Sequence, residues 1–285
     1  MFQLSTIQLL RFHFSLFLVP VYLFALSQLP SVNWSAAGVV FFILHVLVYP
    51  ASNGYNSYMD RDKTPIGGLA RPLQPTKQLF YASVVMDALA VALSMYISVL
   101  FAVGILLYII ASRAYSYRGV RLKRYPIAGF ATVFLFQGAV VFWLTYHGVH
   151  PGNTTDVPLL PCVIASCLIG ALYPLTQIYQ HKEDREDGVI TISMLLGKRG
   201  SFVLSMLLFL TAAAMVFFWF KKMDSLNLFY LFLLVTLPVV LFFLYWMRKV
   251  FYNESAADFK HSLLMNVIAT GCTAVYFTTL IILKH

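Results

Sequence analysis

Two polar stretches of this sequence carry acids and bases directly after long apolar runs. The first, residues 53–72, contains an acid-Arg-acid triplet at 60–62, and the second, residues 177–197, repeats that triplet at 184–186. Charge at the edge of a membrane-embedded run is costly unless it is compensated, and it is therefore usually functional. We expect the chemistry of this chain at these two stretches, and we expect the remaining residues to bring them face to face.

The acids in these stretches have a spacing that suits metal binding. Residues four apart share one face of a helix, and three pairs of oxygen-bearing side chains have this spacing: Asn56 with Asp60, Gln180 with Asp184, and Glu183 with Asp187. Mg²⁺ prefers oxygen ligands, needs few carboxylates and takes its remaining ligands from water and phosphate. One amide and one carboxylate on each of two facing helices therefore suit a magnesium–diphosphate complex. We place Asp60 and Asp184 at its centre, with Asp62 as a further ligand.

Basic side chains accompany these acids. Guanidinium and ammonium groups that converge on one point bind phosphate oxygens. We therefore predict a diphosphate-binding set drawn from both stretches and from the basic segment between them: Arg61, Lys63, Arg71, Arg118, Arg121, Lys123 and Arg185.

The composition is that of an integral membrane protein. Of 285 residues, 60% are apolar and 11% are charged, and the mean hydropathy is +0.78, whereas soluble domains are about half apolar and about a quarter charged. Several apolar runs reach the roughly 20 residues that a helix needs to cross a bilayer, and the alternating short segments of a membrane barrel are absent. The sequence therefore predicts an all-α fold, with about nine membrane-spanning helices in one bundle around a central cavity.

The predicted spans are about 9–29, 35–54, 78–97, 99–112, 127–146, 159–179, 202–220, 226–247 and 261–283. With a cytoplasmic N-terminus, that side of the membrane holds all the Lys and Arg residues except Lys221, Lys222 and Lys284. This positive-inside asymmetry depends on a break between the third and fourth spans. It places both motif loops in the cytoplasm, and it explains the net charge of +9 without nucleic acid as a partner. A cell inner or plasma membrane is the default location.

Residues 1–285 are predicted to form a single transmembrane domain, in which the repeated motifs at 53–72 and 177–197 suggest two pseudo-repeated halves. The first apolar run is about a full span with no small-residue cleavage site after it, so we expect it to remain as the first helix. The three cysteines have no metal-type spacing and indicate neither a disulfide framework nor a zinc site.

The two stretches resemble the signatures of the UbiA superfamily of intramembrane prenyltransferases. Asn56-x-x-x-Asp60-Arg61-Asp62, which leads to Arg71-Pro72, is similar to the first signature of that family. Gln180-x-x-x-Asp184-x-x-x-Gly188-x-x-Thr191, followed by Leu196-Gly197, is similar to the second signature of that family. The segment from Tyr115-Ser116 to Leu122-Lys123 is similar to the family's element between the two signatures. Three positions depart from the family pattern, because Ser57, Thr64 and Gln180 stand where Asp is usual. Three nearby acids are close enough to substitute: Asp62, Glu183 and Asp187.

The resemblance implies Mg²⁺-dependent transfer of a polyprenyl group from an isoprenyl diphosphate to a small lipophilic acceptor within the membrane. The leading acceptor class is an aromatic or quinone precursor, with haem, chlorin, glycerophosphate and carotenoid acceptors left open. In the implied mechanism the allylic carbon–oxygen bond breaks, and aromatic rings stabilise the carbocation by about 0.5–2 kcal/mol each. The aromatic residues next to the motifs are the candidates for this role: Tyr55, Tyr58, Tyr115 and Tyr179.

Two other functions are alternatives. Secondary transporters also combine repeats with intramembrane charge, but their sites lie near the bilayer midplane, whereas the charges here cluster at predicted helix ends. A noncatalytic prenyl-lipid-binding protein on the same scaffold is the second alternative, because three usual carboxylates are missing.

Overall fold

A computed structural model describes residues 3–284, and the part of the chain that it describes is all helical apart from one isolated β-bridge. Within those residues, nine helical segments are long and apolar enough to cross a membrane: Leu4–Gln28, Trp34–Asp60, Lys77–Ser94, Val99–Ser116, Pro126–Val149, Leu159–Gln177, Ile192–Lys222, Leu226–Tyr252 and Phe259–Lys284. The predicted all-α membrane fold is confirmed.

Four of these spans are interrupted. The first consists of α1 (Leu4–Leu10), α2 (Phe12–Ser15), the 3₁₀ turn η1 (Leu16–Leu18) and α3 (Val19–Gln28). The second consists of α4 (Trp34–Phe41), the π-helix η2 (Phe42–Val48) and α5 (Tyr49–Asp60). The fifth consists of α8 (Pro126–Val133), the π-helix η4 (Phe134–Val140) and α9 (Val141–Val149). Departures from α-geometry inside a helix often lie at functional sites.

The seventh span, α12 (Ile192–Lys222), is broken near its start by the non-helical backbone of Gly197 (φ 70°, ψ 173°). The five other spans are single helices: α6 (Lys77–Ser94), α7 (Val99–Ser116), α10 (Leu159–Gln177), α13 (Leu226–Tyr252) and α14 (Phe259–Lys284). Three short elements lie in the connections between spans: the 3₁₀ turn η3 (Leu122–Arg124), α11 (His181–Glu186) and the 3₁₀ turn η5 (Glu254–Ala256). Proline at 174 and at 238 is accommodated inside α10 and α13.

The break between the third and fourth spans lies where the sequence predicts it. α6 ends at Ser94, and the side chain of Ser98 accepts a hydrogen bond from the backbone N–H of Phe101 and so caps α7. The helix ends are less well predicted, since the second span continues to Asp60 and the fourth to Ser116. Both extensions are polar turns of helix that project from the apolar run, so hydropathy alone ends these helices too early.

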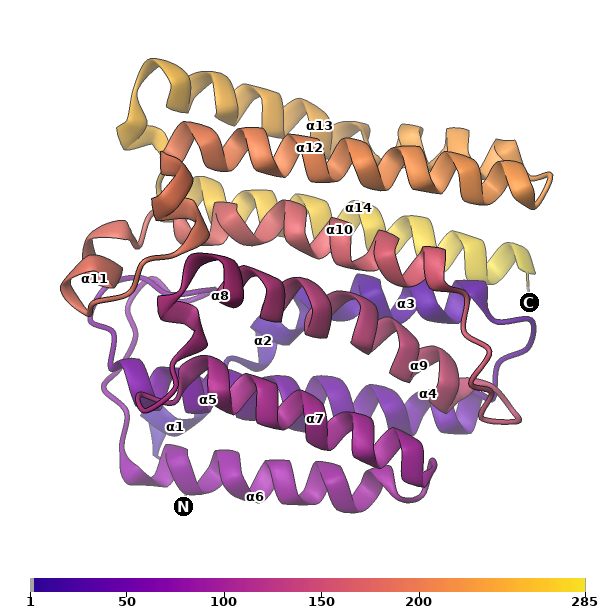
Figure 1. Cartoon of the computed structure of the whole chain (residues 1–285), viewed down its shortest axis with the longest axis horizontal. Helices are drawn as coiled ribbons and strands as arrows, with labels where there is room; N and C mark the ends of the chain where they lie inside the picture. The colour runs from indigo at the N-terminus through magenta and orange to yellow at the C-terminus, as the bar shows by residue number, and fades with distance from the viewer. Residues whose placement is uncertain (1–2, 285) are drawn as a thin grey trace.

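The spans lie side by side with roughly parallel axes, and α11 lies at one end of the bundle, beside the loops that follow α5 and α7 (Figure 1). We call this the motif end. The interior is packed with aromatic side chains; the ring of Phe24 lies 4.6 Å from that of Phe277 and 4.9 Å from that of Phe142, measured between ring centroids. These contacts join α3, α9 and α14, so the first, fifth and last spans share one core.

Candidate active site

The two motif stretches meet at the motif end. α5 stops at Asp60 because Arg61 adopts a left-handed backbone conformation (φ 56°), which turns the chain into the loop that precedes α6. That loop lies against α11. The backbone N–H of Lys63 donates to Oε1 of Glu183 over 2.9 Å, and Nε2 of Gln180 donates to the carbonyl of Pro65 over 3.3 Å.

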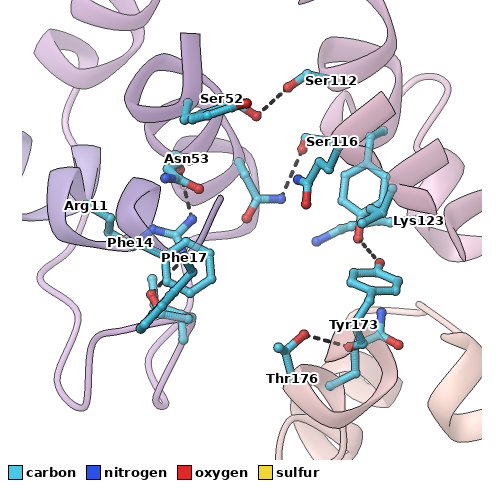
Figure 2. Close-up of a pocket in the computed structure, with 18 of the residues that line it drawn as sticks. Arg11, Phe14, Phe17, Ser52, Asn53, Ser112, Ser116, Lys123, Tyr173 and Thr176 are labelled. Atoms are coloured by element: carbon cyan, nitrogen blue, oxygen red, sulfur yellow. Dashed lines mark hydrogen bonds between the residues drawn. The ribbon is translucent and has the colours of Figure 1, made fainter. Parts of the chain in front are cut away.

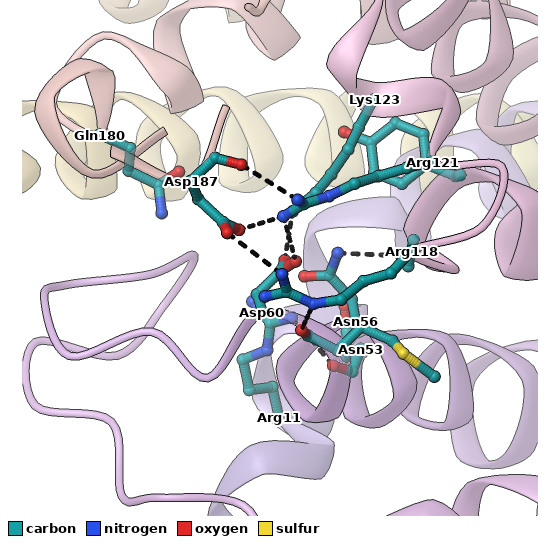
Figure 3. A network of polar contacts seen from close by, with 12 residues as sticks. Arg11, Asn53, Asn56, Asp60, Arg118, Arg121, Lys123, Gln180 and Asp187 are labelled. Carbon is teal, nitrogen blue, oxygen red and sulfur yellow. Dashed lines mark hydrogen bonds and ion pairs between the residues drawn. The ribbon is translucent and has the colours of Figure 1, made fainter. Parts of the chain in front are cut away.

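Asp60 lies at the centre of the polar network that joins these segments (Figure 3). Its side chain is only 5% exposed and forms ion pairs with Lys123 and, over 3.5 Å, with Arg121. Arg121 also pairs with the carboxylate of Asp187 and donates to its carbonyl oxygen over 3.1 Å. Arg118 donates from Nη1 to Asp187 over 3.3 Å. The network therefore connects α5, the loop after α7 and the end of α11.

The segment between α7 and α8 is shaped to place its bases in this network. Arg121 has a left-handed backbone (φ 50°) and is followed by the single turn η3, which carries Lys123. Gly129 in α8 allows this turn to pack closely, since a Cβ at 129 would lie 3.1 Å from the Cα of Lys123. Arg121 is 7% exposed and the Lys123 side chain 11%, so both charges are held away from solvent.

Behind the network lies a cavity of about 240 Å³. Its charged lining groups come from both motifs, from the first span and from η3: Asp60, Asp62, Asp184, Arg11 and Lys123. Six amide side chains also line it: Asn53, Asn56, Gln137, Gln177, Gln180 and Asn266. Figure 2 shows the wall formed by α5 and α7. There Ser52 hydrogen-bonds Ser112 over 2.6 Å, and Asn56 donates to Ser116 over 3.0 Å. The i, i+4 spacing of these residues on each helix directs them to the same face.

Arg11 also lines the cavity, although it lies outside both motif stretches in the sequence. It stands between α1 and α2 with a left-handed backbone (φ 48°) and is 6% exposed. Its guanidinium donates to the carbonyl oxygens of Gly67 and Asn53 over 3.3 and 3.2 Å, and its Nε has no hydrogen-bond partner. An arginine inside an apolar run, eleven residues into the chain, was the available signal.

Of the predicted metal ligands, the structure brings five to the cavity wall: Asn56, Asp60, Asp62, Gln180 and Asp184. Glu183 and Asp187 do not line it. Glu183 accepts from the loop after α5, and one of its oxygens, Oε2, is buried without a partner, while Asp187 pairs with the arginines of the loop after α7.

Of the predicted phosphate-binding residues, Lys123 alone lines the cavity. Arg118 and Arg121 form the network just outside it, whereas four others are exposed at the motif end: Arg61, Lys63, Arg71 and Arg185. The guanidinium of Arg61 lies 5.9 Å from the ring centroid of Tyr58.

Of the four predicted tyrosines, one lines the cavity and three pack elsewhere. Tyr115 lines the cavity and hydrogen-bonds the hydroxyl of Tyr173 across it. Tyr55 and Tyr58 lie instead toward α6, with ring centroids 6.0 and 5.3 Å from that of Phe80. Tyr179 packs against Phe259 of α14.

Burial and mutual repulsion perturb the acids of the site. Burial, and then the charge of Asp60, raise the pKa of Asp62 to about 7. Burial raises the pKa of Asp184 to about 6, with Lys123 opposing that rise and Asp60 adding to it. Burial and neighbouring carboxylates both disfavour the charged form of a carboxyl group, so a cation bound beside Asp62 and Asp184 would stabilise their charged forms.

These residues fit a magnesium ion bound together with a phosphate-bearing ligand. Among the described residues, no three His, Cys, Asp or Glu side chains are already close enough to hold a metal. Mg²⁺, however, needs only one or two carboxylates and completes its shell with water and phosphate oxygens. The donors present are carboxylate and amide oxygens, and burial raises the pKa of both Asp62 and Asp184, so a bound cation would favour their charged forms.

The chain is similar to several solved membrane proteins. A UbiA homologue from Archaeoglobus fulgidus, bound to GPP and Mg²⁺, matches with a TM-score of 0.71 and 17% identity over 97% of this chain and 99% of that one. A UbiA homologue from Aeropyrum pernix K1 matches with a TM-score of 0.65 and 18% identity over 92% and 97%. A digeranylgeranylglyceryl phosphate synthase matches with a TM-score of 0.64 and 17% identity over 97% and 98%. A search of curated proteins finds no match.

Fold and site together define an integral membrane protein with a polar cavity at one end of a helical bundle. The profile of the UbiA prenyltransferase family matches residues 15–268, so the chain belongs to that family. The family resemblance noted in the sequence is thereby confirmed. The members of this family are prenyltransferases.

Proposed function

We propose that this protein transfers a polyprenyl group from an isoprenyl diphosphate to a small lipophilic acceptor, with Mg²⁺ as cofactor. The observation that carries the proposal is the convergence of three acids and two bases on one buried cavity: Asp60, Asp62, Asp184, Arg11 and Lys123. Two related structures from Archaeoglobus fulgidus that share the fold contain GPP or DMAPP together with Mg²⁺.

In the proposed complex, Asp60 and Asp184 would hold the metal, with Asn56 and Gln180 as neutral oxygen ligands from the same cavity wall. A bound Mg²⁺ would neutralise charge on the diphosphate and so make it a better leaving group. Lys123 approaches from η3 and Arg11 from the first span, and their charges favour the diphosphate as it departs. Arg121 positions Asp60 by pairing both with it and with Asp187.

The walls of the cavity suit a carbocation. Aromatic faces stabilise a cation without reacting with it, and burial keeps competing water away. Tyr115 and Tyr173 lie on the lining beside the acids, and Phe14, Phe17 and Phe136 lie further along it. We propose an aromatic or quinone-precursor acceptor, which would enter the cavity beside the allylic carbon.

We also propose that the motif end faces the cytoplasm. The basic residues concentrate there, as the positive-inside rule requires, and a water-soluble diphosphate headgroup would then reach the site from that side. Against a transporter, the charged groups gather at this end of the bundle rather than near its middle, where transporters bind their substrates.

The test is pyrophosphate release by the purified protein in nanodiscs, from geranyl, farnesyl and geranylgeranyl diphosphates, with Mg²⁺ or with EDTA, against a panel of aromatic acceptors. We expect metal-dependent release that Asp184→Ala abolishes while the protein remains folded. Glu186→Ala is the matched control, because Glu186 lies on the same short helix, is exposed and is absent from the cavity wall.

Three outcomes separate the candidate functions. Metal-dependent release with a prenylated product supports the transferase. Binding of a prenyl diphosphate without metal dependence and without turnover supports a noncatalytic lipid-binding protein. Loss of flux across the membrane in Asp184→Ala, without any prenylated product from the parent protein, supports a transporter.

A further inference from the structure

A second cavity, of about 360 Å³, lies deeper in the bundle among α3, α10, α12, α13 and α14. Its lining side chains are apolar except for Ser205 and three threonines. The hydroxyls of Thr236 and Thr273 donate to backbone carbonyls of their own helices, so they offer little to a polar ligand. The Ser205 hydroxyl is buried on this lining without a hydrogen-bond partner, and the rest of the cavity suits a hydrocarbon.

The two cavities share a wall. Phe17, Ile169 and Leu172 line both of them. Ile169 and Leu172 belong to the regular helix α10, whereas Phe17 lies in η1, the 3₁₀ turn within the broken first span. Phe17 contacts the ring of Phe14 edge-on, with centroids 5.2 Å apart, and Phe14 lies under the guanidinium of Arg11. Figure 2 shows this run from Arg11 through Phe14 to Phe17 along one side of the polar cavity.

We propose that Phe17 determines which prenyl donors the enzyme accepts, because the donor's tail must pass it to reach the second cavity. The inference rests on the proposed transferase function. The polar cavity has to hold a diphosphate, its metal and the acceptor, so only the first part of the prenyl chain stays there. The remainder enters the apolar cavity through the passage between Phe17 and the two α10 residues.

The second cavity opens at the surface of the bundle, where its lining residues Leu210, Leu233 and Leu244 are 55%, 43% and 44% exposed. Its volume therefore gives the length of tail that fills it, and a longer tail would extend into the bilayer. An apolar cavity of about 150 Å³ accommodates a six-carbon ring, so a cavity of about 360 Å³ holds roughly two to three five-carbon isoprene units. With the first unit in the polar cavity, the donor class is one of about three or four units, farnesyl or geranylgeranyl diphosphate. A geranyl tail, by contrast, ends near Phe17 and gains little from the second cavity.

The test measures donor affinity without an acceptor. Geranyl, farnesyl and geranylgeranyl S-thiolodiphosphates, which resist ionisation, are titrated calorimetrically with Mg²⁺ into the full-length protein in nanodiscs. Phe17→Trp narrows the passage, and we expect it to weaken geranylgeranyl binding about tenfold, equivalent to about 1.4 kcal/mol, while geranyl binding stays within about twofold. Phe17→Ala widens the passage and should raise the ratio of geranylgeranyl to geranyl affinity.

The matched control is Leu16→Trp. Leu16 lies in the same 3₁₀ turn, is 52% exposed and lines neither cavity, so its substitution should leave the affinity of every donor unchanged. Leu172→Phe narrows the same passage from α10 and should repeat the chain-length effect of Phe17→Trp, which keeps the inference testable if one variant fails to fold.

The outcomes separate this inference from the proposed function. If the parent protein binds none of the thiolodiphosphates in the presence of Mg²⁺, the proposed function fails. If the parent protein binds them but the Phe17 and Leu172 variants change all chain lengths equally, or change none, the assignment of Phe17 is overturned. A chain-length-selective loss in Phe17→Trp that is absent in Leu16→Trp supports it.

Discussion

Replacing Lys123 with methionine tests the electrostatic core of the site. The Lys123 side chain is 11% exposed and pairs with Asp60, which is 5% exposed. Methionine keeps most of the length of the side chain and removes only the charge. The substitution therefore changes two quantities, the stability of the metal-free protein and the rate of the proposed reaction, and their magnitudes differ.

Breaking a buried ion pair by removing one partner costs about 3–5 kcal/mol, because the other charge stays buried. Here the loss is smaller, since Arg121 still contacts Asp60 over 3.5 Å, and we expect a decrease of about 2 kcal/mol in the free energy of unfolding. The expected loss of reaction rate corresponds to a larger free energy than this loss of stability. A single group aimed at charge that develops in the transition state is worth about 10²–10³ in rate, so kcat/KM should fall by that factor.

The assay is Mg²⁺-dependent pyrophosphate release, with thermal unfolding of the same preparation as a measure of stability. Arg124→Met is the matched control: Arg124 is the next residue of η3, is exposed, and its guanidinium lies over the ring of Tyr125 at 4.9 Å rather than in the cavity. The double variant Asp60→Asn with Lys123→Met should recover stability but not activity. If Lys123→Met kept the kcat/KM of the parent protein, the assignment of Lys123 to the leaving group would be refuted.

Three further results are expected. Protons compete with Mg²⁺ for Asp62 and Asp184, whose pKa values are about 7 and about 6 without metal. Mg²⁺ affinity measured by calorimetry should therefore rise from about pH 5 to about pH 8, by up to about tenfold per pH unit for each proton displaced. An affinity that does not change with pH would exclude both residues as ligands. Gly138→Ala should lower stability by about 1–3 kcal/mol in thermal unfolding, because the new Cβ would lie 2.3 Å from the backbone of α10. Asp87→Asn breaks a half-buried pair with Arg113 between α6 and α7, whose side chains are 14% and 19% exposed, and should cost about 1–3 kcal/mol, less than a fully buried pair, part of which a second change, Arg113→Met, should restore.

The number of spans was predictable because it follows from local apolar runs, and the meeting of the two motifs was predictable from their repeated acid-Arg-acid pattern and the family resemblance. A run of apolar residues identifies a membrane helix wherever it packs, and the i, i+4 spacing of Asn56 and Asp60 places both on one face of α5. Which side chains reach the cavity depends instead on how helices rotate against one another. Tyr55 and Tyr58 lie beside the motif in sequence yet pack toward Phe80 of α6, and no local pattern distinguishes them from Tyr115.

Arg11 is a cavity residue that no sequence motif indicates. It is far from both motifs in sequence, and it reaches the site because the first helix breaks at its left-handed backbone and its guanidinium binds the carbonyls of Asn53 and Gly67. Neither the break nor these long-range contacts has a sequence signature. The apolar cavity beyond Phe17 is equally unpredictable from sequence, since its volume is set by five helices packing together.

The structure gives a physical reason for the three positions at which this chain lacks the family's usual Asp: Ser57, Thr64 and Gln180. Gln180 donates through its amide nitrogen to the carbonyl of Pro65, a contact that a carboxylate could not make, and it thereby fixes the loop that carries Asp62. Ser57 is 3% exposed and has no hydrogen-bond partner for its hydroxyl, so a carboxylate there would be buried and unpaired at a cost of several kcal/mol. Thr64 is exposed, whereas Asp62 reaches the cavity wall. The acidic charge of the first motif is thus concentrated on Asp60 and Asp62, and the missing acids at 57 and 180 reduce repulsion in a site where the remaining carboxylates already resist ionisation.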